Sequence, residues 1–293
     1  MTEARSEYHR DAIKRGLFAY RDKDGKPREL NGVKIVTCAD GSSDTSVQIA
    51  FLLSQEVLKS AKVKDLNVST YSGQEMGRIF GQVTMEYLKK CLDNIKPDKL
   101  REFTFGAGRI VRYAQYAHLE EISDLVKRFE ELQLDLGEDY IVEGDILVGR
   151  QPVADSDFGP DYISAKNGIA TSTPTRKEGA GIHFPILQAS ISCKWTMRSD
   201  RAQNVRTEAL NLIRHRKGRL PAMLFATAEP EPTRLASLAK GTGDIDRVYH
   251  FALYELIKAV DNLGNKNQKA QLDLLVRGKR LSDISDLPFD IIT

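Results

Sequence analysis

The sequence has 293 residues, of which 41% are hydrophobic and 29% are charged, and its formal net charge is +2. This composition is typical of a globular protein with enough apolar material for one large domain, and it argues against a disordered chain. No apolar run reaches the roughly 18–20 residues that a membrane helix needs, and the opening MTEARSEYHR contains no apolar signal segment. We therefore expect a cytoplasmic protein without a membrane partner.

Cysteine, histidine and glycine patterns disfavour several classes of enzyme. Cys38, Cys91 and Cys193 are too few and too scattered for a disulfide framework or a four-ligand zinc site, and the histidines form no H-x-x-x-H pair. The chain contains no G-x-x-x-x-G-K-[ST] loop, and its glycine clusters FGAGR and KGTGD lack the G-x-G-x-x-G spacing. A zinc hydrolase and an enzyme with a nucleotide cofactor are therefore both disfavoured.

The first half of the chain predicts helices followed by a strand. Helical apolar spacing covers residues 47–62 and 76–95, and a long helical region is expected from about Arg109 to Leu136. YIVEGDILVGR, residues 140–150, is rich in β-branched and aliphatic residues and predicts a strand or a strand pair.

The second half alternates strands and helices. After an irregular segment at 151–183, we expect a strand at 186–197, a helix at 200–215, a strand at 222–228, short helices after Pro232 and a helix at 252–263. This alternation predicts an α/β fold with a central mixed sheet, formed by a single domain over residues 1–293.

Positive charge is concentrated in residues 190–219, SISCKWTMRSDRAQNVRTEALNLIRHRKGR. Eight Lys or Arg side chains stand there against two acids, Asp200 and Glu208, which gives a local charge of +6. Because the whole chain is only +2, the remaining residues sum to −4. The residues within and around this basic segment therefore have to explain why so much positive charge is gathered there.

The strand that opens this segment has one apolar and one polar face. Side chains alternate between the faces of a strand, so Ile191, Cys193, Trp195 and Met197 share one face, and Ser190, Ser192, Lys194 and Thr196 share the other. Lysine is seldom buried without a partner. Lys194 is therefore either a solvated lysine on an edge or surface strand, or a functional group beside Ser192.

The helix that follows carries an acid next to its buried stripe. Ser199 or Asp200 can cap its start, and Val205, Ala209 and Leu212 have the spacing of a buried face. Glu208 flanks this stripe on the side that Arg201 shares. A plain salt bridge accounts for such a glutamate, and so does a role as a metal ligand.

A third acid extends the pattern. Asp145 interrupts the aliphatic GDILV; Lys194 follows after 48 intervening residues and Glu208 after 13 more, giving the order D…S-x-K…E. A strand carboxylate in this order can hold a divalent cation, the lysine can reach an attacking water, and the helix carboxylate can complete the ion or water shell. Acid and lysine spacings of this kind also arise by chance.

The D…S-C-K…E order followed closely by RSDR resembles the Type II restriction endonucleases of the PD-(D/E)XK superfamily, and within it the NgoMIV-like group that cuts sites containing CCGG. The most specific block is ASISCKWTMRSDRAQNVRTEALNLIRHRKGRLP, residues 189–221. Further blocks are RYAQYAHL (112–119), TAEPEPTR (227–234), GTGDIDRVYHFALYEL (241–256) and GKRLSDISDLP (278–288). The resemblance implies a restriction-endonuclease-like fold of three α/β/α layers, with helices on both sides of the sheet.

The resemblance also implies the chemistry. Asp145 and the backbone carbonyl of Cys193 would bind Mg²⁺, with two ions per active site, and Glu208 would join the metal shell. Lys194 would orient the hydrolytic water and help to deprotonate it, supported by Ser192. Two ions can stabilise the attacking and leaving oxygens together, and the products would be a 5′-phosphate and a 3′-hydroxyl.

Recognition residues follow from the same resemblance. Arg198, Asp200 and Arg201 would read the CCGG core, because arginine donates to guanine O6 and N7 and aspartate accepts from cytosine N4. Their alternative role is a helix cap with solvated arginines. Asp40, Ser42 and Arg234 match the positions for the outer base pairs, which predicts GCCGGC as the full site. The downstream basic residues would contact phosphates, or form a solvated helix end; they are Arg214, Arg216, Lys217 and Arg219.

Two positions depart from the family pattern. Gly144 stands where a proline usually precedes the metal-binding aspartate. Family members also carry an active-site glutamate a few residues after a Ser-Gly pair. Here Ser72-Gly73 leads to Gly77 or Gly81 at the expected place, while Glu75 lies nearby, about 200° round a helix axis from Gly77.

We therefore expect a sequence-specific, Mg²⁺-dependent endonuclease that acts on double-stranded DNA as a homotetramer, a dimer of dimers, cutting after the first base of its site. Two alternatives remain open. One is a DNA-binding protein that does not cleave and whose acids form salt bridges. The other is a repair or structure-specific nuclease of the same superfamily.

Overall fold

The computed structural model describes residues 2–95, 102–129, 131, 141–152, 184–197, 199–241 and 243–292. Within them the chain forms two compact units. The first consists of Met1–Asn94, Ser192–Arg206 and Leu224–Thr293, and the second of Ile95–Ile191 and Thr207–Met223. The strand β8 (Ile186–Lys194) begins in the second unit and ends in the first.

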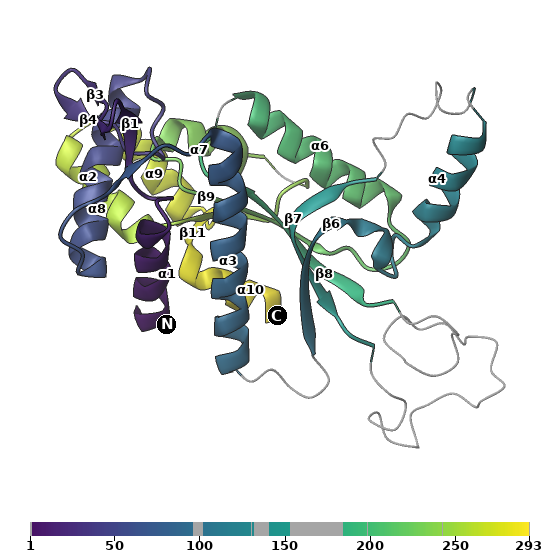
Figure 1. The fold of residues 1–293 in the computed structure, drawn as a ribbon. Coiled ribbons are helices and arrows are strands. Elements are labelled where there is room, and N and C mark those ends of the chain that lie inside the picture. Colours follow the sequence, from purple (N-terminus) through teal and green to yellow (C-terminus); the bar gives the residue numbers. More distant parts are fainter. Residues whose placement is uncertain are drawn as a thin grey trace. The chain divides into compact units, whose positions relative to one another are not determined.

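The first unit begins with helices and short strands (Figure 1). Their bounds are α1 Thr2–Lys14, β1 Tyr20–Lys23, β2 Lys26–Pro27, β3 Glu29–Leu30, β4 Val33–Lys34, α2 Asp44–Ala61, β5 Val68–Ser69 and α3 Gly73–Ile95. The sequence predicted α2 and α3 but none of these strands. Most of the strands span only two residues, which is too short for an alternating pattern to appear.

The rest of the first unit alternates strands and helices. After β8 and the helix α6 (Ser199–His215) come β9 Ala222–Thr227, α7 Pro232–Ala239, β10 Arg247–His250, α8 Leu253–Leu263, α9 Lys266–Arg277, β11 Leu281–Asp283, η4 Ile284–Asp286 and α10 Leu287–Ile292. Parallel pairing joins β9 to β10 and β10 to β11. The predicted strand at 222–228 and helix at 252–263 are confirmed within one residue at their ends.

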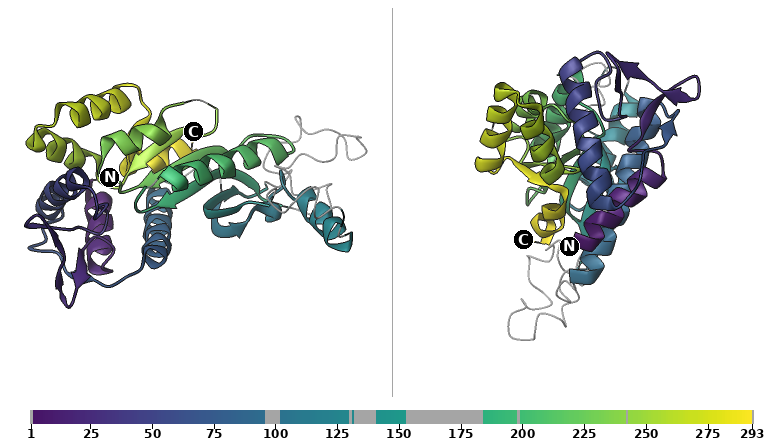
Figure 2. Two further views of the ribbon diagram at one scale, coloured as in Figure 1. Left: turned by 90° about the horizontal axis from the view of Figure 1, so that it is seen from above. Right: turned by 90° about the vertical axis from the view of Figure 1, so that its left-hand side faces the viewer.

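Local sequence explains the ends of these helices. The Ser43 hydroxyl accepts a hydrogen bond from the Ser46 N–H and caps α2, whose last turn is closed by Lys62 in the left-handed region. Gly264 ends α8 in the same way, with a φ of 72° that glycine adopts without strain. Helix α8 packs against α2 and α9 (Figures 1 and 2).

The second unit contains an antiparallel ladder. Strand β6 (Phe103–Arg109) pairs with β7 (Glu143–Arg150), which pairs with the start of β8 (Ile186–Lys194). The 3₁₀ turn η1 (Ile110–Arg112) and helix α4 (His118–Arg128) follow β6. The last element is the end of α6 (Ser199–His215).

The predicted helix from Arg109 to Leu136 is wrong over its first part. Arg109 pairs with Glu143 in the sheet, and the chain then turns through η1 before α4 begins at His118. Ile110, Val111, Tyr113 and Tyr116 are buried at spacings that imitate a helix. The residues at 130 and 132–136, like most of the predicted irregular segment at 151–183, lie outside the described residues.

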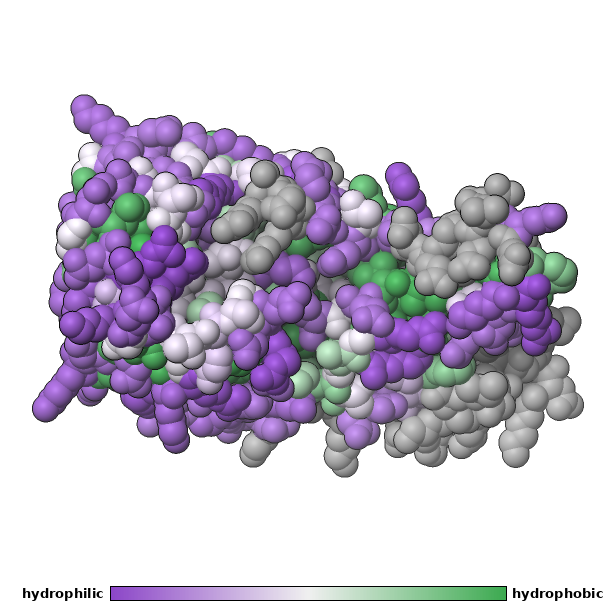
Figure 3. Space-filling view, turned by 45° about the horizontal axis from the view of Figure 1, so that its top comes forward, coloured by the Kyte–Doolittle hydropathy of each residue, from purple (hydrophilic) through white to green (hydrophobic). Residues whose placement is uncertain are grey.

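Six of the described strands form one sheet, in the order β11-β10-β9-β8-β7-β6. The parallel β9, β10 and β11 and the antiparallel β6 and β7 make the sheet mixed, and helices flank it in the three-layer α/β/α arrangement that was predicted. No helix among the described residues combines the length and apolar character that crossing a membrane requires. On the face in Figure 3 hydrophilic side chains predominate, and hydrophobic ones gather in separate areas between them.

An aromatic cluster forms the centre of the first unit. The indole of Trp195 packs edge-on against Phe80 and Phe251, with ring centroids 5.1 and 5.3 Å away. Phe18 completes the contact at 6.2 Å. Trp195 is 2% exposed, and its Nε1 donates to the Thr37 hydroxyl over 3.3 Å. Edge-to-face ring contacts add to the burial of this large side chain, so Trp195 holds its strand firmly in the core.

Replacing Trp195 with Leu should therefore lower the free energy of unfolding by about 3 kcal/mol, because a cavity replaces most of the indole. Urea denaturation followed by circular dichroism measures this change. Phe129→Leu is the control, since Phe129 is 57% exposed and its loss should cost under about 0.5 kcal/mol. Equal stability of the Trp195→Leu variant and the wild type would contradict the anchoring role.

Candidate active site and recognition residues

Strand β8 presents the predicted polar and apolar faces. Ile191, Cys193, Trp195 and Met197 are each at most 2% exposed. Ser192, Lys194 and Thr196 between them are only half-buried. The alternation predicted from the sequence is confirmed, although regular strand pairing ends at Lys194 rather than at Met197.

Lys194 does not lie on an edge strand. Within the sheet, β8 has β9 as one neighbour and β7 as the other. The backbone beyond Lys194 continues this contact, because the Ala228 N–H donates to the Trp195 carbonyl over 3.2 Å. The interpretation of Lys194 as a solvated edge lysine is therefore wrong, and its side chain is half-buried on an interior strand.

Asp145 lies near the start of β7, where the strand changes from exposed to buried. Its side chain is exposed, whereas Ile146, Leu147 and Val148 are fully buried. Ile146 pairs with Ile191 of β8. A Cβ at Gly144 would clash with Cδ2 of Leu147, so a larger residue there would require the leucine side chain to move. Asp145 is thus an exposed residue that directly precedes a run of buried residues.

Helix α6 buries the predicted stripe and leaves Glu208 beside it. Val205, Ala209 and Leu212 are at most 5% exposed, and Glu208 is half-buried. Arg206 on the same helix is used inside the first unit: it pairs with Asp244 at 2.5 Å and donates to the carbonyls of Leu238 and Lys240. One of the eight basic side chains therefore stabilises the fold.

The predicted core-reading residues are only partly described. Arg198 lies outside the described residues, and Asp200 and Arg201 lie in the first turn of α6 without a described side chain. The residue before them, Met197, is fully placed. The predicted capping by Ser199 or Asp200 therefore stays a prediction.

The three residues predicted for the outer base pairs come together in the first unit. Arg234 of α7 donates through Nη2 to Asp40 over 2.7 Å, although the two residues are 194 positions apart. The Ser42 hydroxyl donates to the other oxygen of Asp40 over 2.7 Å. These hydrogen bonds from Ser42 and Arg234 hold the pKa of Asp40 well below its usual range. We call Asp40, Ser42 and Arg234 the outer cluster.

The outer cluster is connected to the segment that precedes Arg198. Arg234 also pairs with Glu231 through Nε at 3.1 Å and donates through Nη1 to the Met197 carbonyl over 3.4 Å. Its side chain is 28% exposed, and that of Asp40 is 17% exposed. The guanidinium is thus held by partners on three sides while part of it remains open to solvent.

A buried glutamate holds the same segment from its other side. Glu229 is 0% exposed, and its Oε2 accepts a hydrogen bond from the Met197 N–H over 2.9 Å. Its Oε1 accepts from the Glu231 N–H over 3.2 Å. Burial raises the pKa of Glu229 to about 7, because the charged form loses its hydration.

Glu75 caps the helix on which an extra active-site acid was expected. Its carboxylate accepts from the Ser72 N–H over 2.8 Å, and the Ser72 hydroxyl accepts from the Glu75 N–H over 3.3 Å. This reciprocal pair is a capping box at the start of α3. A Cβ at Gly77 or Gly81 would meet open space, so neither glycine is required by packing.

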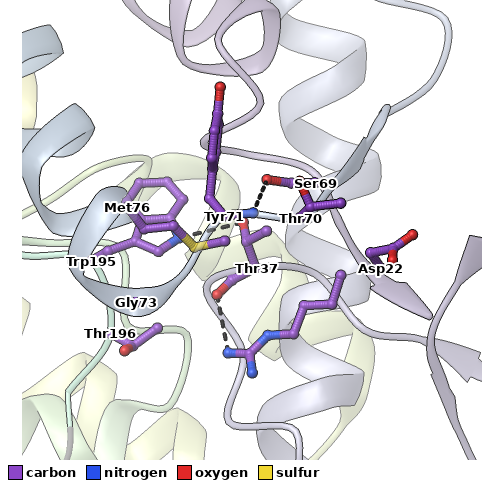
Figure 4. A pocket seen from close by; sticks show the side chains of 10 residues that line it. Asp22, Thr37, Ser69, Thr70, Tyr71, Gly73, Met76, Trp195 and Thr196 are labelled. Atoms are coloured by element: carbon purple, nitrogen blue, oxygen red, sulfur yellow. Dashed lines mark hydrogen bonds between the residues drawn. The ribbon is translucent and has the colours of Figure 1, made fainter. Parts of the chain in front are cut away.

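A cavity of about 420 Å³ opens beside the residues that follow Lys194 (Figure 4). Trp195, Thr196 and Met76 line it together with Thr37, Ser69 and Tyr71. Arg21 reaches it from β1 and donates to the carbonyls of Thr37 and Ala39. The cavity borders the same segment that Trp195 anchors.

Three of the four downstream basic residues, Arg214, Lys217 and Arg219, are exposed. Arg216 instead folds back onto the end of α6 and donates to the Ile213 carbonyl. The backbone of Lys217 is held by the Gln115 carbonyl over 2.9 Å. Contacts from Arg214, Lys217 and Arg219 to DNA phosphates stay a prediction.

The described residues contain no group of three or more His, Cys, Asp or Glu side chains that could hold a metal ion. The predicted ligand set does not require one. It consists of two carboxylates, Asp145 and Glu208, and the backbone carbonyl of Cys193. Oxygen donors of this kind fit Mg²⁺, which retains several waters and takes further ligands from substrate phosphates.

The α/β/α arrangement, with an acid on one strand and a Ser-x-Lys on the next, is that of the restriction-endonuclease-like nucleases. The family model of the NgoMIV restriction enzyme matches residues 8–293. The chain is also 41% identical over 283 residues to the Type II restriction enzyme NgoMIV of Neisseria gonorrhoeae, covering 94% of this chain and 96% of that protein. The chain therefore belongs to the NgoMIV restriction enzyme family, and it is a site-specific endonuclease of double-stranded DNA.

Sequence reasoning missed Glu229, which holds the Met197 N–H, and Glu231, which pairs with Arg234. Glu229 directly follows the buried run AMLFATA, where a charged residue is uncommon, and this position was the available signal. Glu231 begins α7 just before Pro232. Nothing in the local pattern indicates that either residue contacts a segment more than 30 positions earlier.

The raised pKa of Glu229 predicts a pH-dependent stability. Between its ordinary pKa of 4.5 and about 7 the folded chain keeps a proton that the unfolded chain has lost. This contribution to stability is full below pH 4.5 and is lost as the pH rises through 7. Glu229→Gln removes this titration. The free energy of unfolding of the variant should therefore rise relative to that of the wild type between pH 5 and 8, by on the order of 3 kcal/mol at most.

Urea unfolding of both proteins at several pH values measures this difference. Comparing the two proteins cancels the contributions of other titrating groups, including the buried His9 and His250, whose pKa values burial lowers to about 4. A difference in unfolding free energy that stays constant from pH 5 to 8 would show that Glu229 does not titrate there.

Proposed function

We propose that this endonuclease recognises GCCGGC and cuts each strand after the first G. The products would carry a four-base 5′ overhang, a 5′-phosphate and a 3′-hydroxyl. The observation that carries this assignment is the outer cluster, because Arg234 and Asp40 lie side by side at 2.7 Å. Arginine donates to guanine and aspartate accepts from cytosine, so an adjacent pair suits the two edges of one outer G·C base pair.

The CCGG core would be read by Arg198, Asp200 and Arg201 at the start of α6. Two arginines and one aspartate match neighbouring guanine and cytosine edges, and each good bidentate contact is worth roughly 1–3 kcal/mol of discrimination. Arg214, Lys217 and Arg219 would contact phosphates, which adds salt-dependent affinity without sequence information.

Asp145, Glu208 and the Cys193 carbonyl would hold the divalent metal, which we take to be Mg²⁺, two per active site. When bound, such ions stabilise the charge that develops on the attacking and leaving oxygens. Lys194 would orient the attacking water and take part in its deprotonation. Ser192, on the same half-buried face of β8, would support this water. No covalent intermediate with the enzyme is needed.

Both units would act as one DNA-cleaving domain, and four chains would assemble as a dimer of dimers that engages two sites at once. An enzyme that cuts DNA inside the cell would work in the cytoplasm. The assembly follows from the resemblance to the family rather than from a contact in the single chain.

Incubation with a plasmid that contains one GCCGGC site tests the proposal. With Mg²⁺ the enzyme should linearise the plasmid, and with EDTA it should leave the plasmid intact. Lys194→Ala should lower the cleavage rate by at least about 100-fold, in the range for a general acid–base group, while gel-shift affinity stays within a few-fold.

The outcomes also separate the alternatives. A gel shift without any strand scission would favour a DNA-binding protein that does not cleave. This result would have to hold with Mg²⁺, with Mn²⁺, and when Mg²⁺ replaces Ca²⁺ after binding. Nicks that depend on DNA damage, rather than uniform fragments, would favour a repair nuclease. Loss of DNA binding in Lys194→Ala would mean that the lysine has been given the wrong role.

A further inference from the structure

Glu229 is a fully buried carboxylate with two converging hydrogen bonds. Both of its oxygens accept from backbone N–H groups, one from Met197 at 2.9 Å and one from Glu231 at 3.2 Å. Its own N–H donates to the Thr227 hydroxyl over 3.1 Å. The side chain therefore joins the backbone before α6 to the backbone at the start of α7.

Met197 is held at every polar point of its backbone. Its N–H donates to Glu229 and its carbonyl accepts from Arg234. Its side chain is 2% exposed, and Trp195 two residues earlier is anchored in the aromatic cluster. The residue after Met197 in the sequence is Arg198, so the atoms that Glu229 and Arg234 contact belong to the residue directly before the proposed core-reading residues.

A contribution to stability does not by itself explain why a carboxylate is buried at position 229. A buried ionised group costs free energy unless its partners compensate for its lost hydration, and an apolar side chain often serves a core better. A carboxylate does offer two acceptor oxygens to two donors. An amide of the same shape offers only one acceptor and turns an N–H₂ group towards the other donor.

We propose that Glu229 is a positioning residue for sequence discrimination. It fixes the backbone of Met197, which Arg234 of the outer cluster also contacts and which directly precedes the proposed base-reading residues Arg198, Asp200 and Arg201 in the sequence. This inference rests on the proposed base-reading role of those three residues. Glu229 itself does not touch DNA, because its side chain is fully buried.

The test compares the wild type with Glu229→Gln on two DNA substrates. One contains GCCGGC, and the other carries one changed base pair in the CCGG core. The ratio of the two cleavage rates should fall by about 10-fold or more in the variant, the amount that corresponds to weakening one base contact. A protein that loses only stability would keep this ratio.

Val260→Ala is the matched control. Val260 is 1% exposed on α8 of the same unit, so its truncation destabilises the core without removing a contact to Met197. The control should keep the wild-type ratio at a temperature where it is folded. A wild-type ratio in Glu229→Gln, or an equal loss in Val260→Ala, would overturn the positioning role.

If Glu229→Gln does not fold, Glu229→Asp serves in its place, because it keeps the charge but cannot reach both donors. Asp200→Ala in the same assay separates this inference from the proposed function. Lost discrimination in Asp200→Ala with a normal ratio in the Glu229 variant refutes the positioning role alone. Normal discrimination in Asp200→Ala refutes base reading, and the positioning role with it.

Discussion

The packing of Trp195 is the constraint on which the rest of this structure depends. Its indole packs against Phe18, Phe80 and Phe251 and donates a hydrogen bond to Thr37. These contacts fix the backbone at Trp195. Strand alternation then turns Lys194 and Thr196 to the opposite face. A buried aromatic side chain thus determines which face of the strand carries Lys194, the proposed catalytic lysine one residue earlier in the chain.

The same segment links the proposed chemistry to the proposed recognition. Lys194 precedes Trp195, and the residues proposed to read bases begin directly after Met197 in the sequence. Glu229 and Arg234 hold Met197 through its N–H and carbonyl. Arg234 also joins Asp40 of the outer cluster. The local excess of positive charge divides accordingly: Arg206 supports the fold and Arg216 contacts the end of its own helix. Arg214, Lys217 and Arg219 are exposed, as the proposed phosphate contacts require.

The sequence predicts those parts of the fold that have a strong period. Alternation in residues 191–197 and the stripe Val205, Ala209 and Leu212 agree with the structure, because one face of each element is buried, whereas Ser190 of the predicted polar face is also buried. The two-residue strands of the first unit have no period to detect, and the burial pattern after Arg109 imitates a helix. Asp40, Ser42 and Arg234 were found through the family resemblance. Glu229 was missed because its partners lie far away in sequence.

The central claim is that the residues directly after Met197 and the outer cluster together read a six-base site. Sequencing the ends of genomic DNA digested with the purified enzyme tests this claim most directly. Our account predicts that every fragment begins with 5′-CCGGC and that the base before each cut is G. Ends that share only CCGG, or that begin at unrelated sequences, would contradict it.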